Sequence, residues 1–97
     1  MDSYFFYVVL CHNGAFYAGT TNDVQNRLKV HNQGKGAKYT RSHLPVKLIY
    51  QEKFTNKSDA LSFEIKFKKM TRTQKEKYLN SHCNNFNQKQ LLFKGNS

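Results

Sequence analysis

The sequence has few acidic residues, and this shortage points to the kind of partner it favours. Only 6 aspartates and glutamates stand against 16 lysines and arginines, so the formal net charge is +10. Such an excess favours a polyanionic partner, and nucleic acid is the commonest one. Charge alone leaves open a basic protein that contacts ribosomes or anionic lipid without specificity.

Cysteine and long apolar runs are also scarce. Cys11 and Cys83 are the only cysteines, and their positions indicate neither a disulfide framework nor a zinc site. No apolar stretch reaches the roughly 18 residues that a membrane span needs. The N-terminal segment has neither a basic region nor a small-residue cleavage site, so we do not expect a signal peptide. The expected compartment is the reducing cytoplasm.

The residues that are present suit one small folded domain. The chain has 97 residues, of which 38% are hydrophobic and 14% aromatic, which is enough for a core. We expect the domain to span residues 1–80. An Asn- and Gln-rich appendage, residues 81–97, would follow with one weak apolar cluster at residues 91–93. No internal repeat or long linker divides the chain.

Two apolar runs around a turn open the predicted fold. Residues 4–11 are aromatic and β-branched and predict a central strand covered on both faces. Asn13-Gly14 is a strong hairpin signal, and residues 15–20 predict the returning strand.

Helices and one more strand follow. Three N-cap residue types at positions 21–23 predict a helix that ends near residue 32. An ordered loop over 33–45 and a strand over 46–54 come next. Ser58 is the expected cap of a second helix to about residue 70, and a capping box at 73–76 predicts a third. The expected fold class is α+β, a small three-stranded antiparallel sheet flanked by helices in the order β-β-α-β-α-α.

Several polar side chains occupy positions where packing alone would favour hydrocarbon. Arg27 and His31 lie inside the arc bounded by the apolar residues of the first helix. Each alone suits a snorkelling arginine or a half-buried histidine with a partner. Tyr7 and Tyr17 lie on the paired strands and can approach one surface, although strand tyrosines usually serve in packing.

Glu64 gives a sharper signal because it falls near the middle of the apolar arc of the second helix. A buried carboxylate is costly unless it is paired or binds a cation. The structural alternative is an i,i+4 salt bridge with Lys68.

Together these spacings resemble the GIY-YIG nuclease superfamily. The similarity is greatest to its small stand-alone members, which are related to the nuclease domain of the bacterial excision-repair incision subunit. It covers about residues 4–79. The matching segments are Phe5-Phe6-Tyr7 for Gly-Ile-Tyr, Tyr17-Ala18-Gly19 for Tyr-Ile-Gly, residues 22–28 for the arginine helix, residues 34–41 for the basic loop, and Ser58-Asp59-Ala60-Leu61 with Glu64 for the glutamate helix.

The resemblance implies a divalent-metal-dependent DNA endonuclease with five catalytic side chains. Glu64 would bind one Mg²⁺ or Mn²⁺, and Arg27 would hold a phosphate oxygen. Tyr7 would act as the general base and pass a proton to His31. Tyr17 would position the water or the phosphate, and the roles of the two tyrosines could be exchanged.

Two departures from the family pattern stand out. Thr20 follows Gly19 where the repair-subunit domain has a lysine, which removes one phosphate contact. The late asparagine of the family has no clear counterpart, and the nearest candidates are Glu76 and Asn80.

The basic loop predicts the substrate. Lys35, Lys38 and Arg41 would bind the nucleic acid, and Tyr39 would stack on a base, an arrangement that suits single strands. The alternative is a solvated basic loop. We find no zinc finger, helix-hairpin-helix or second domain, so we expect little sequence specificity. The expected partner is single-stranded or branched DNA in repair, recombination or uptake, bound by a monomer without a small-molecule cofactor. The rival hypothesis is a weak or inactive nucleic-acid-binding module.

Overall fold

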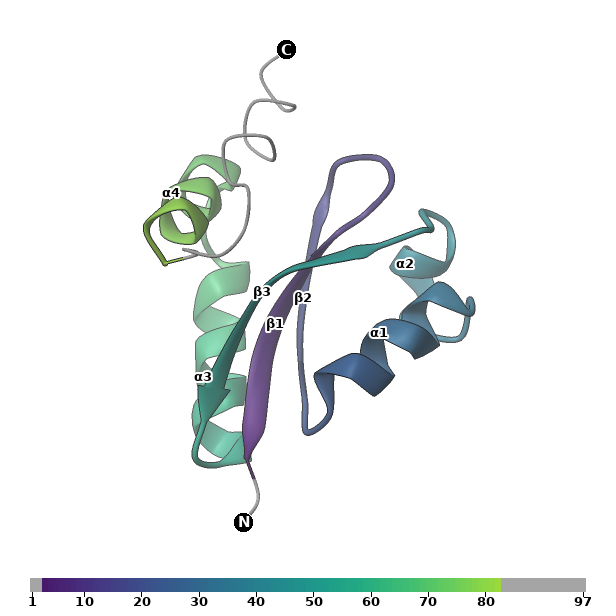
Figure 1. Cartoon of the computed structure of the whole chain (residues 1–97). Helices are drawn as coiled ribbons and strands as arrows, with labels where there is room; N and C mark the ends of the chain where they lie inside the picture. Colours follow the sequence, from purple (N-terminus) through teal and green to yellow (C-terminus); the bar gives the residue numbers. More distant parts are fainter. Residues whose placement is uncertain (1–2, 83–97) are drawn as a thin grey trace.

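A three-stranded antiparallel sheet with helices on both of its faces forms the fold in the computed structural model, which describes residues 3–82 (Figure 1). The strands pair in the order β2-β1-β3. The elements are β1 (Tyr4–Leu10), β2 (Phe16–Thr21), α1 (Val24–Asn32), α2 (Lys38–Arg41), β3 (Lys47–Phe54), α3 (Lys57–Lys68) and α4 (Arg72–His82). The predicted α+β class is confirmed, and α2 adds a short helix within the predicted loop 33–45.

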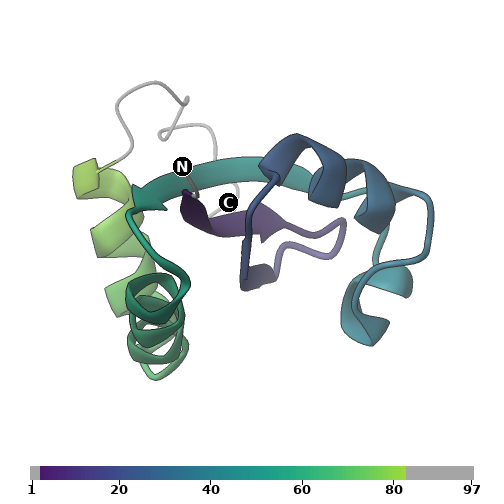
Figure 2. The same cartoon turned by 90° about the horizontal axis from the view of Figure 1, so that it is seen from below.

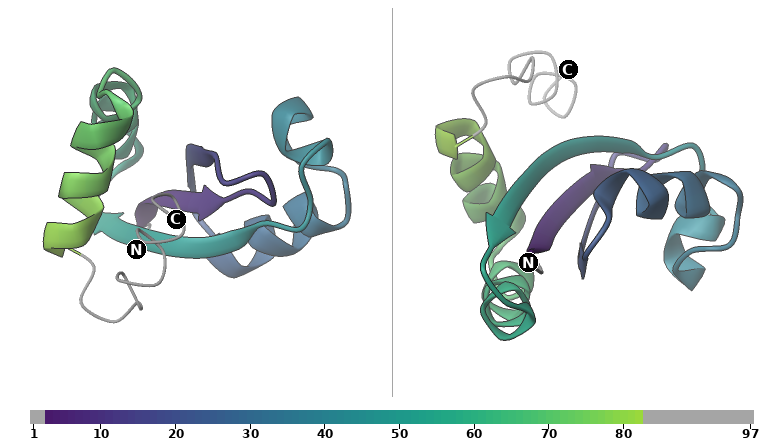
Figure 3. Two further views of the ribbon diagram at one scale, coloured as in Figure 1. Left: turned by 90° about the horizontal axis from the view of Figure 1, so that it is seen from above. Right: turned by 60° about the horizontal axis from the view of Figure 1, so that its bottom comes forward.

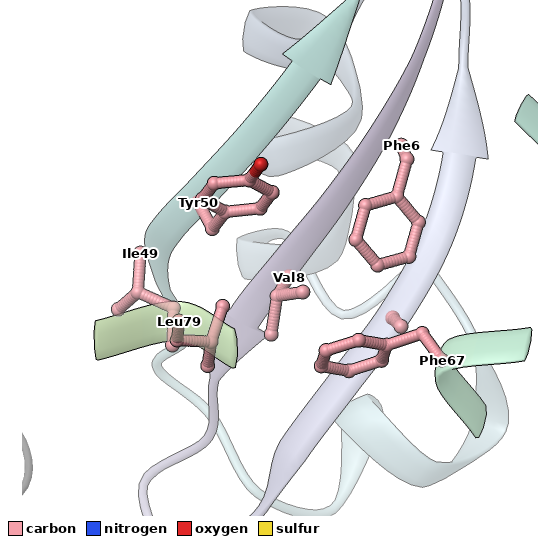
Figure 4. Packing of buried hydrophobic residues seen from close by; sticks show 7 residues of the cluster. Phe6, Val8, Ile49, Tyr50, Phe67 and Leu79 are labelled. Atoms are coloured by element: carbon pink, nitrogen blue, oxygen red, sulfur yellow. The ribbon is translucent and has the colours of Figure 1, made fainter. Parts of the chain in front are cut away.

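The central strand β1 is buried on both faces, as its unbroken apolar run predicts. Alternate side chains of a strand point to opposite faces. On one face a core cluster packs under α3 and α4, and Figure 4 shows its residues, six of them labelled. Its buried members are Phe6, Val8, Ala18, Ile49, Tyr50, Phe67 and Leu79.

The other face of β1 packs against α1 and the segment before β3. Tyr7, Val9, Cys11 and Val46 form this second cluster, and Leu28 of α1 packs against it. Figures 2 and 3 show α1 and α2 on one side of the sheet and α3 and α4 on the other. The two faces therefore have different partners.

The β1–β2 hairpin sets the positions of the two tyrosines. The backbone N–H of Cys11 donates to Ala15 at 2.8 Å, and Gly14, with φ of +90°, closes the turn between them. A glycine with positive φ at this place is typical of hairpin turns. The register pairs Tyr7 with Gly19 and Val9 with Tyr17, so both tyrosines lie diagonally on the same face of the sheet.

The helix starts confirm one predicted cap and correct another. The Asp23 carboxylate accepts a hydrogen bond from the Asn26 backbone N–H at 3.0 Å and caps α1. Asn56, and not Ser58, caps α3, because its side-chain oxygen accepts from the Asp59 backbone N–H at 2.8 Å. Ser58 lies inside the first turn, where the backbone is already helical.

The capping box of α4 lies two residues before the predicted one. The backbone N–H of Gln74 donates to the Thr71 hydroxyl at 3.1 Å, and the Thr71 N–H donates to the Gln74 side chain at 2.9 Å. Such reciprocal bonds satisfy two helix-end donors at once. The prediction of a box at residues 73–76 was wrong, because both ends of that segment are inside the helix.

Arg72 ties α4 to the hairpin. Its guanidinium donates to the Gly14 carbonyl at 3.0 Å and stacks 3.8 Å from the Phe16 ring centroid. Of the predicted appendage, Ser81 and His82 form the end of α4, and residues 83–97 lie outside the described residues. Across residues 3–82, no helix combines the length and apolar character that crossing a bilayer requires.

Candidate active site

The Tyr7 side chain lies across β2, and Gly19 makes room for it. The two residues are direct partners in the sheet, and Tyr7 is only 4% exposed. A Cβ atom at position 19 would lie 2.6 Å from the Tyr7 hydroxyl oxygen. A glycine in a strand often marks such a close approach. Gly19 therefore allows the phenol to reach the edge of the sheet.

A chain of buried hydrogen bonds begins at the Tyr7 hydroxyl. The hydroxyl oxygen lies 3.0 Å from Nε2 of His31 on α1, and Nδ1 of His31 lies 3.0 Å from the Thr40 hydroxyl on α2. The Thr40 hydroxyl donates to the Ala37 carbonyl at 2.8 Å. His31 and Thr40 are 1% and 0% exposed, so the chain is sealed from water on this side.

Two further neighbours enclose the His31 ring. The loop backbone at Gly36 lies against the ring, and a Cβ there would collide with His31 Nδ1. The Tyr17 ring centroid lies 5.6 Å from that of His31 in an edge-on arrangement. The structure therefore brings both predicted tyrosines to the predicted histidine.

Burial and the charges near the Tyr7 hydroxyl shift its pKa. Burial raises this pKa above the ordinary value for tyrosine, and Tyr17 and Glu64 raise it further, while the Arg27 guanidinium opposes them. Burial, with help from Arg27, lowers the pKa of His31. The imidazole is therefore neutral near pH 7 and has a free lone pair for a proton, whereas Tyr7 keeps its own proton.

Glu64 on α3 lies within electrostatic reach of Tyr7 and pairs with Lys68. Its side chain is 16% exposed, and its Oε2 lies 2.6 Å from the Lys68 Nζ. The same Nζ lies 5.7 Å from the centroid of the Tyr17 ring. The predicted alternative, an i,i+4 salt bridge, is present, and the carboxylate also raises the pKa of Tyr7 slightly. Lys68 offsets the cost of its partial burial.

The donor set limits which metal ion could bind. Among residues 3–82, no three His, Cys, Asp or Glu side chains are grouped so that they could hold an ion. Glu64 is the one carboxylate among the five predicted catalytic side chains. This donor set fits Mg²⁺ or Mn²⁺, which keep several waters and accept substrate phosphate oxygens as ligands. Zinc, which requires three or four protein ligands, does not fit.

The predicted nucleic-acid residues surround the buried Thr40. Lys35, Lys38 and Arg41 are exposed, and Tyr39 is 44% exposed. The Tyr39 hydroxyl accepts a hydrogen bond from the Asn13 amide at 3.0 Å. Since Thr40 contacts His31, α2 places this basic surface beside the site.

The residues at the two departures from the family pattern do not lie on the Tyr7 face of the sheet. They are Thr20, Glu76 and Asn80. Thr20 pairs with Phe6, so its side chain is on the face opposite Tyr7. Glu76 forms an ion pair with Arg72, and Asn80 is exposed further along α4.

Nothing in the sequence singles out Thr40, Gly36 or the position of Lys68 over Tyr17. A threonine in a polar loop gives no signal of its own. Gly36 looks like ordinary loop glycine, yet its φ is not in the positive range, so only the contact with His31 explains it. Lys68 was predicted as a partner of Glu64 but not as a neighbour of the tyrosine.

Comparison with known proteins agrees with the resemblance in the sequence. The model of the GIY-YIG catalytic domain family matches residues 3–78. A UPF0213 protein of Bacillus velezensis is 54% identical over 78 residues, which cover 80% of this chain and 79% of the relative. The UPF0213 protein YazA of Bacillus subtilis is 49% identical over 83 residues, which cover 86% and 84%.

Two solved structures are also similar. The solution NMR structure of a UPF0213 protein from Bacillus halodurans has a TM-score of 0.59 and 33% identity, covering 90% of this chain and 93% of that one. A solution NMR structure of an E. faecalis protein has a TM-score of 0.58 and 49% identity, with 84% and 90% covered.

Proposed function

Because the chain belongs to the GIY-YIG catalytic domain family, a family of nucleases, we propose that it is a divalent-metal-dependent DNA endonuclease. The proposed substrate is single-stranded or branched DNA, cleaved with little sequence specificity. The observation that supports this most is the buried contact of 3.0 Å between the Tyr7 hydroxyl and His31, with Arg27 and Glu64 within electrostatic reach.

Because its pKa is raised, Tyr7 is protonated before the reaction. This favours a proton relay through Tyr7 over a mechanism in which Tyr7 starts as a phenolate. In this scheme the Tyr7 oxygen takes a proton from the attacking water while its own proton passes to His31 Nε2. The water oxygen forms a bond to phosphorus, the bond to the leaving sugar oxygen breaks, and solvent protonates that oxygen. The lowered pKa of His31 keeps its lone pair free before the step.

Arg27 and Glu64 supply the electrostatic part of the proposal. The exposed Arg27 guanidinium can hold a nonbridging phosphate oxygen with a fixed fork of donors. Glu64 would hold the Mg²⁺ or Mn²⁺, once Lys68 moves from its carboxylate. A bound ion stabilises the charge that develops on the phosphate.

The basic surface formed by α2 and the loop before it suits a flexible strand. Lys35, Lys38 and Arg41 are exposed around a half-exposed Tyr39, so phosphates and one base can be contacted together. A duplex presents its bases only in grooves, and α2, with four residues, is too short to fill one.

Cleavage assays with metal removal test the function. Labelled single-stranded, duplex and flap DNA of matched sequence are incubated with Mg²⁺ or Mn²⁺, with and without EDTA. We expect cleavage of the single-stranded and flap substrates with either ion, and none with EDTA. Cleavage that persists in EDTA, or no cleavage of any substrate with either ion, would refute the proposal.

Removing two charges from α2 is expected to weaken DNA binding without abolishing cleavage. Each phosphate contact on a single strand contributes about 0.7 to the slope of log affinity against log salt concentration. The Lys38→Gln/Arg41→Gln variant should therefore lower that slope by about 1.4, measured by fluorescence anisotropy.

The matched control removes the same charge from the far end of the molecule. Lys53→Gln/Lys57→Gln changes exposed lysines at the end of β3 and the start of α3, away from α2 (Figure 1). It should keep the slope of the natural sequence. Equal slopes for both double variants would show that α2 does not hold the strand.

The second candidate function is nucleic-acid binding without hydrolysis. The observation that favours it is the Glu64–Lys68 pair, in which Lys68 already occupies the carboxylate. Binding of single-stranded DNA without metal-dependent cleavage would select this alternative.

A further inference from the structure

The direction of the hydrogen bonds around Thr40 is determined by its single proton. The Thr40 hydroxyl donates to the Ala37 carbonyl at 2.8 Å. A hydroxyl has one proton to donate. While the Thr40 proton is in that bond, the Thr40 oxygen can only accept from His31, and the contact of 3.0 Å then needs a proton on His31 Nδ1.

The tautomer of His31 follows from this direction. A neutral imidazole has one protonated nitrogen, so a proton on Nδ1 leaves Nε2 with its lone pair. Nε2 is the atom that lies 3.0 Å from the Tyr7 hydroxyl. Tyr7 must then donate, and its proton points along the bond that the relay uses.

We propose that Thr40 is a positioning residue that holds His31 in the Nδ1–H tautomer, so that Nε2 can receive the Tyr7 proton. This inference rests on the proposed nuclease function for its catalytic consequence. The opposite tautomer would place a proton on Nε2, and His31 could then donate to Tyr7 but not accept from it. Thr40 is fully buried and touches no reacting atom, so its effect acts through His31.

The same short helix then has two separable tasks. Lys38, Tyr39 and Arg41 face outward for the substrate, while Thr40 faces inward to the histidine. Thr40→Val should lower kcat with KM nearly unchanged. Lys38→Gln/Arg41→Gln should mainly raise KM.

The tautomer can be read directly by NMR in the whole protein. Long-range ¹H–¹⁵N spectra of histidine rings, recorded above pH 7, show which nitrogen bears the proton. The chain has 4 histidines, and a His31→Asn sample identifies the signal of His31. We expect the Nδ1–H form in the natural sequence, with or without DNA.

Two variants of Thr40 separate the hydroxyl from the shape of the side chain. Thr40→Ser keeps the hydroxyl and should keep the Nδ1–H form and most of the activity. Thr40→Val keeps the shape, removes the acceptor, and should shift His31 toward the Nε2–H form. We expect kcat to fall about 10- to 100-fold, the loss found when a partner that orients a metal-ligating histidine is removed.

The outcomes distinguish this inference from the proposed function. An Nε2–H form in the natural sequence overturns the inference, even if Thr40→Val does not fold. An unchanged tautomer and kcat in a folded Thr40→Val protein overturn it as well. If no substrate is cleaved by the natural sequence but the spectra behave as expected, the nuclease proposal fails while the tautomer assignment stands.

Discussion

Glu64→Gln is expected to reduce metal-dependent cleavage by about 10³-fold or more, which corresponds to about 4 kcal/mol of lost transition-state stabilisation. The amide keeps the size of the carboxylate and removes its charge. A neutral amide oxygen is a poor replacement where a single protein ligand must hold the ion. Single-turnover cleavage of a labelled single strand, titrated with Mn²⁺, measures both the rate and the apparent metal affinity.

The matched control for this variant is Glu76→Gln. Both glutamates lie on helices and pair with a basic residue four positions away, Glu64 with Lys68 and Glu76 with Arg72. Only Glu64 acts on the pKa of Tyr7. The protein with Glu76→Gln should cleave the single-stranded substrate at the rate of the unchanged protein. If the two variants lose activity equally, the loss reflects broken helix ion pairs and not a metal site.

DNA binding gives an independent check on Glu64→Gln. The substitution removes a negative charge near the proposed phosphate position, so affinity for a single strand in EDTA should stay the same or rise. A variant that loses both binding and cleavage would indicate a damaged fold, which circular dichroism would reveal. Retained binding with lost cleavage supports the assigned role of the carboxylate.

Tyr7→Phe is expected to lower kcat by about 10²- to 10⁴-fold, the usual contribution of a positioned acid-base group. Phenylalanine keeps the ring over Gly19 and removes the oxygen that links the water to His31. KM should change little, because the hydroxyl is buried and takes part in proton transfer rather than in strand binding. Steady-state kinetics on a single-stranded substrate separate the two parameters.

Tyr50→Phe is the matched control, since it removes a buried tyrosine hydroxyl from the opposite face of the sheet. The Tyr50 hydroxyl donates to Glu52 at 2.6 Å, far from the proposed chemistry. This variant should keep its activity. Equal losses for both tyrosines would assign the effect to stability and contradict a role for Tyr7 as base.

Tyr7→Phe should remain folded. The change leaves His31 Nε2 without its partner, and a buried unpaired group costs about 1–3 kcal/mol. Removal of the buried phenol oxygen offsets part of this cost. We expect the unfolding free energy to fall by about 1–2 kcal/mol in urea titrations, an amount that small domains usually tolerate.

The strands and their order could be predicted because their signals are local. The unbroken run over β1 indicates burial on both faces, and Asn13-Gly14 fixes the hairpin that places Tyr7 and Tyr17 on one side. Glu64 was identifiable because a carboxylate within an apolar helix face requires an explanation. Its salt bridge with Lys68 was predicted as an alternative, and the structure shows that pair, while its role as a metal ligand stays a prediction.

The remaining features depend on contacts between distant segments, which local patterns do not encode. Gly36 is necessary because the loop passes against His31, and Thr40 matters because a one-turn helix folds back on α1. The caps of α3 and α4 were misassigned for a simpler reason. Several polar residues near each start can cap, and only the backbone path selects Asn56 and Thr71.

The face of the sheet away from Tyr7 carries an aromatic core. Aromatic rings pack edge to face there. The Phe6 ring centroid lies 4.8 Å from that of Phe63 and 5.2 Å from that of Phe67. This packing stabilises the fold through residues that have no part in the proposed chemistry. Substitutions around Tyr7 and His31 could therefore remove the proposed chemistry while this aromatic core still holds the sheet and its helices together.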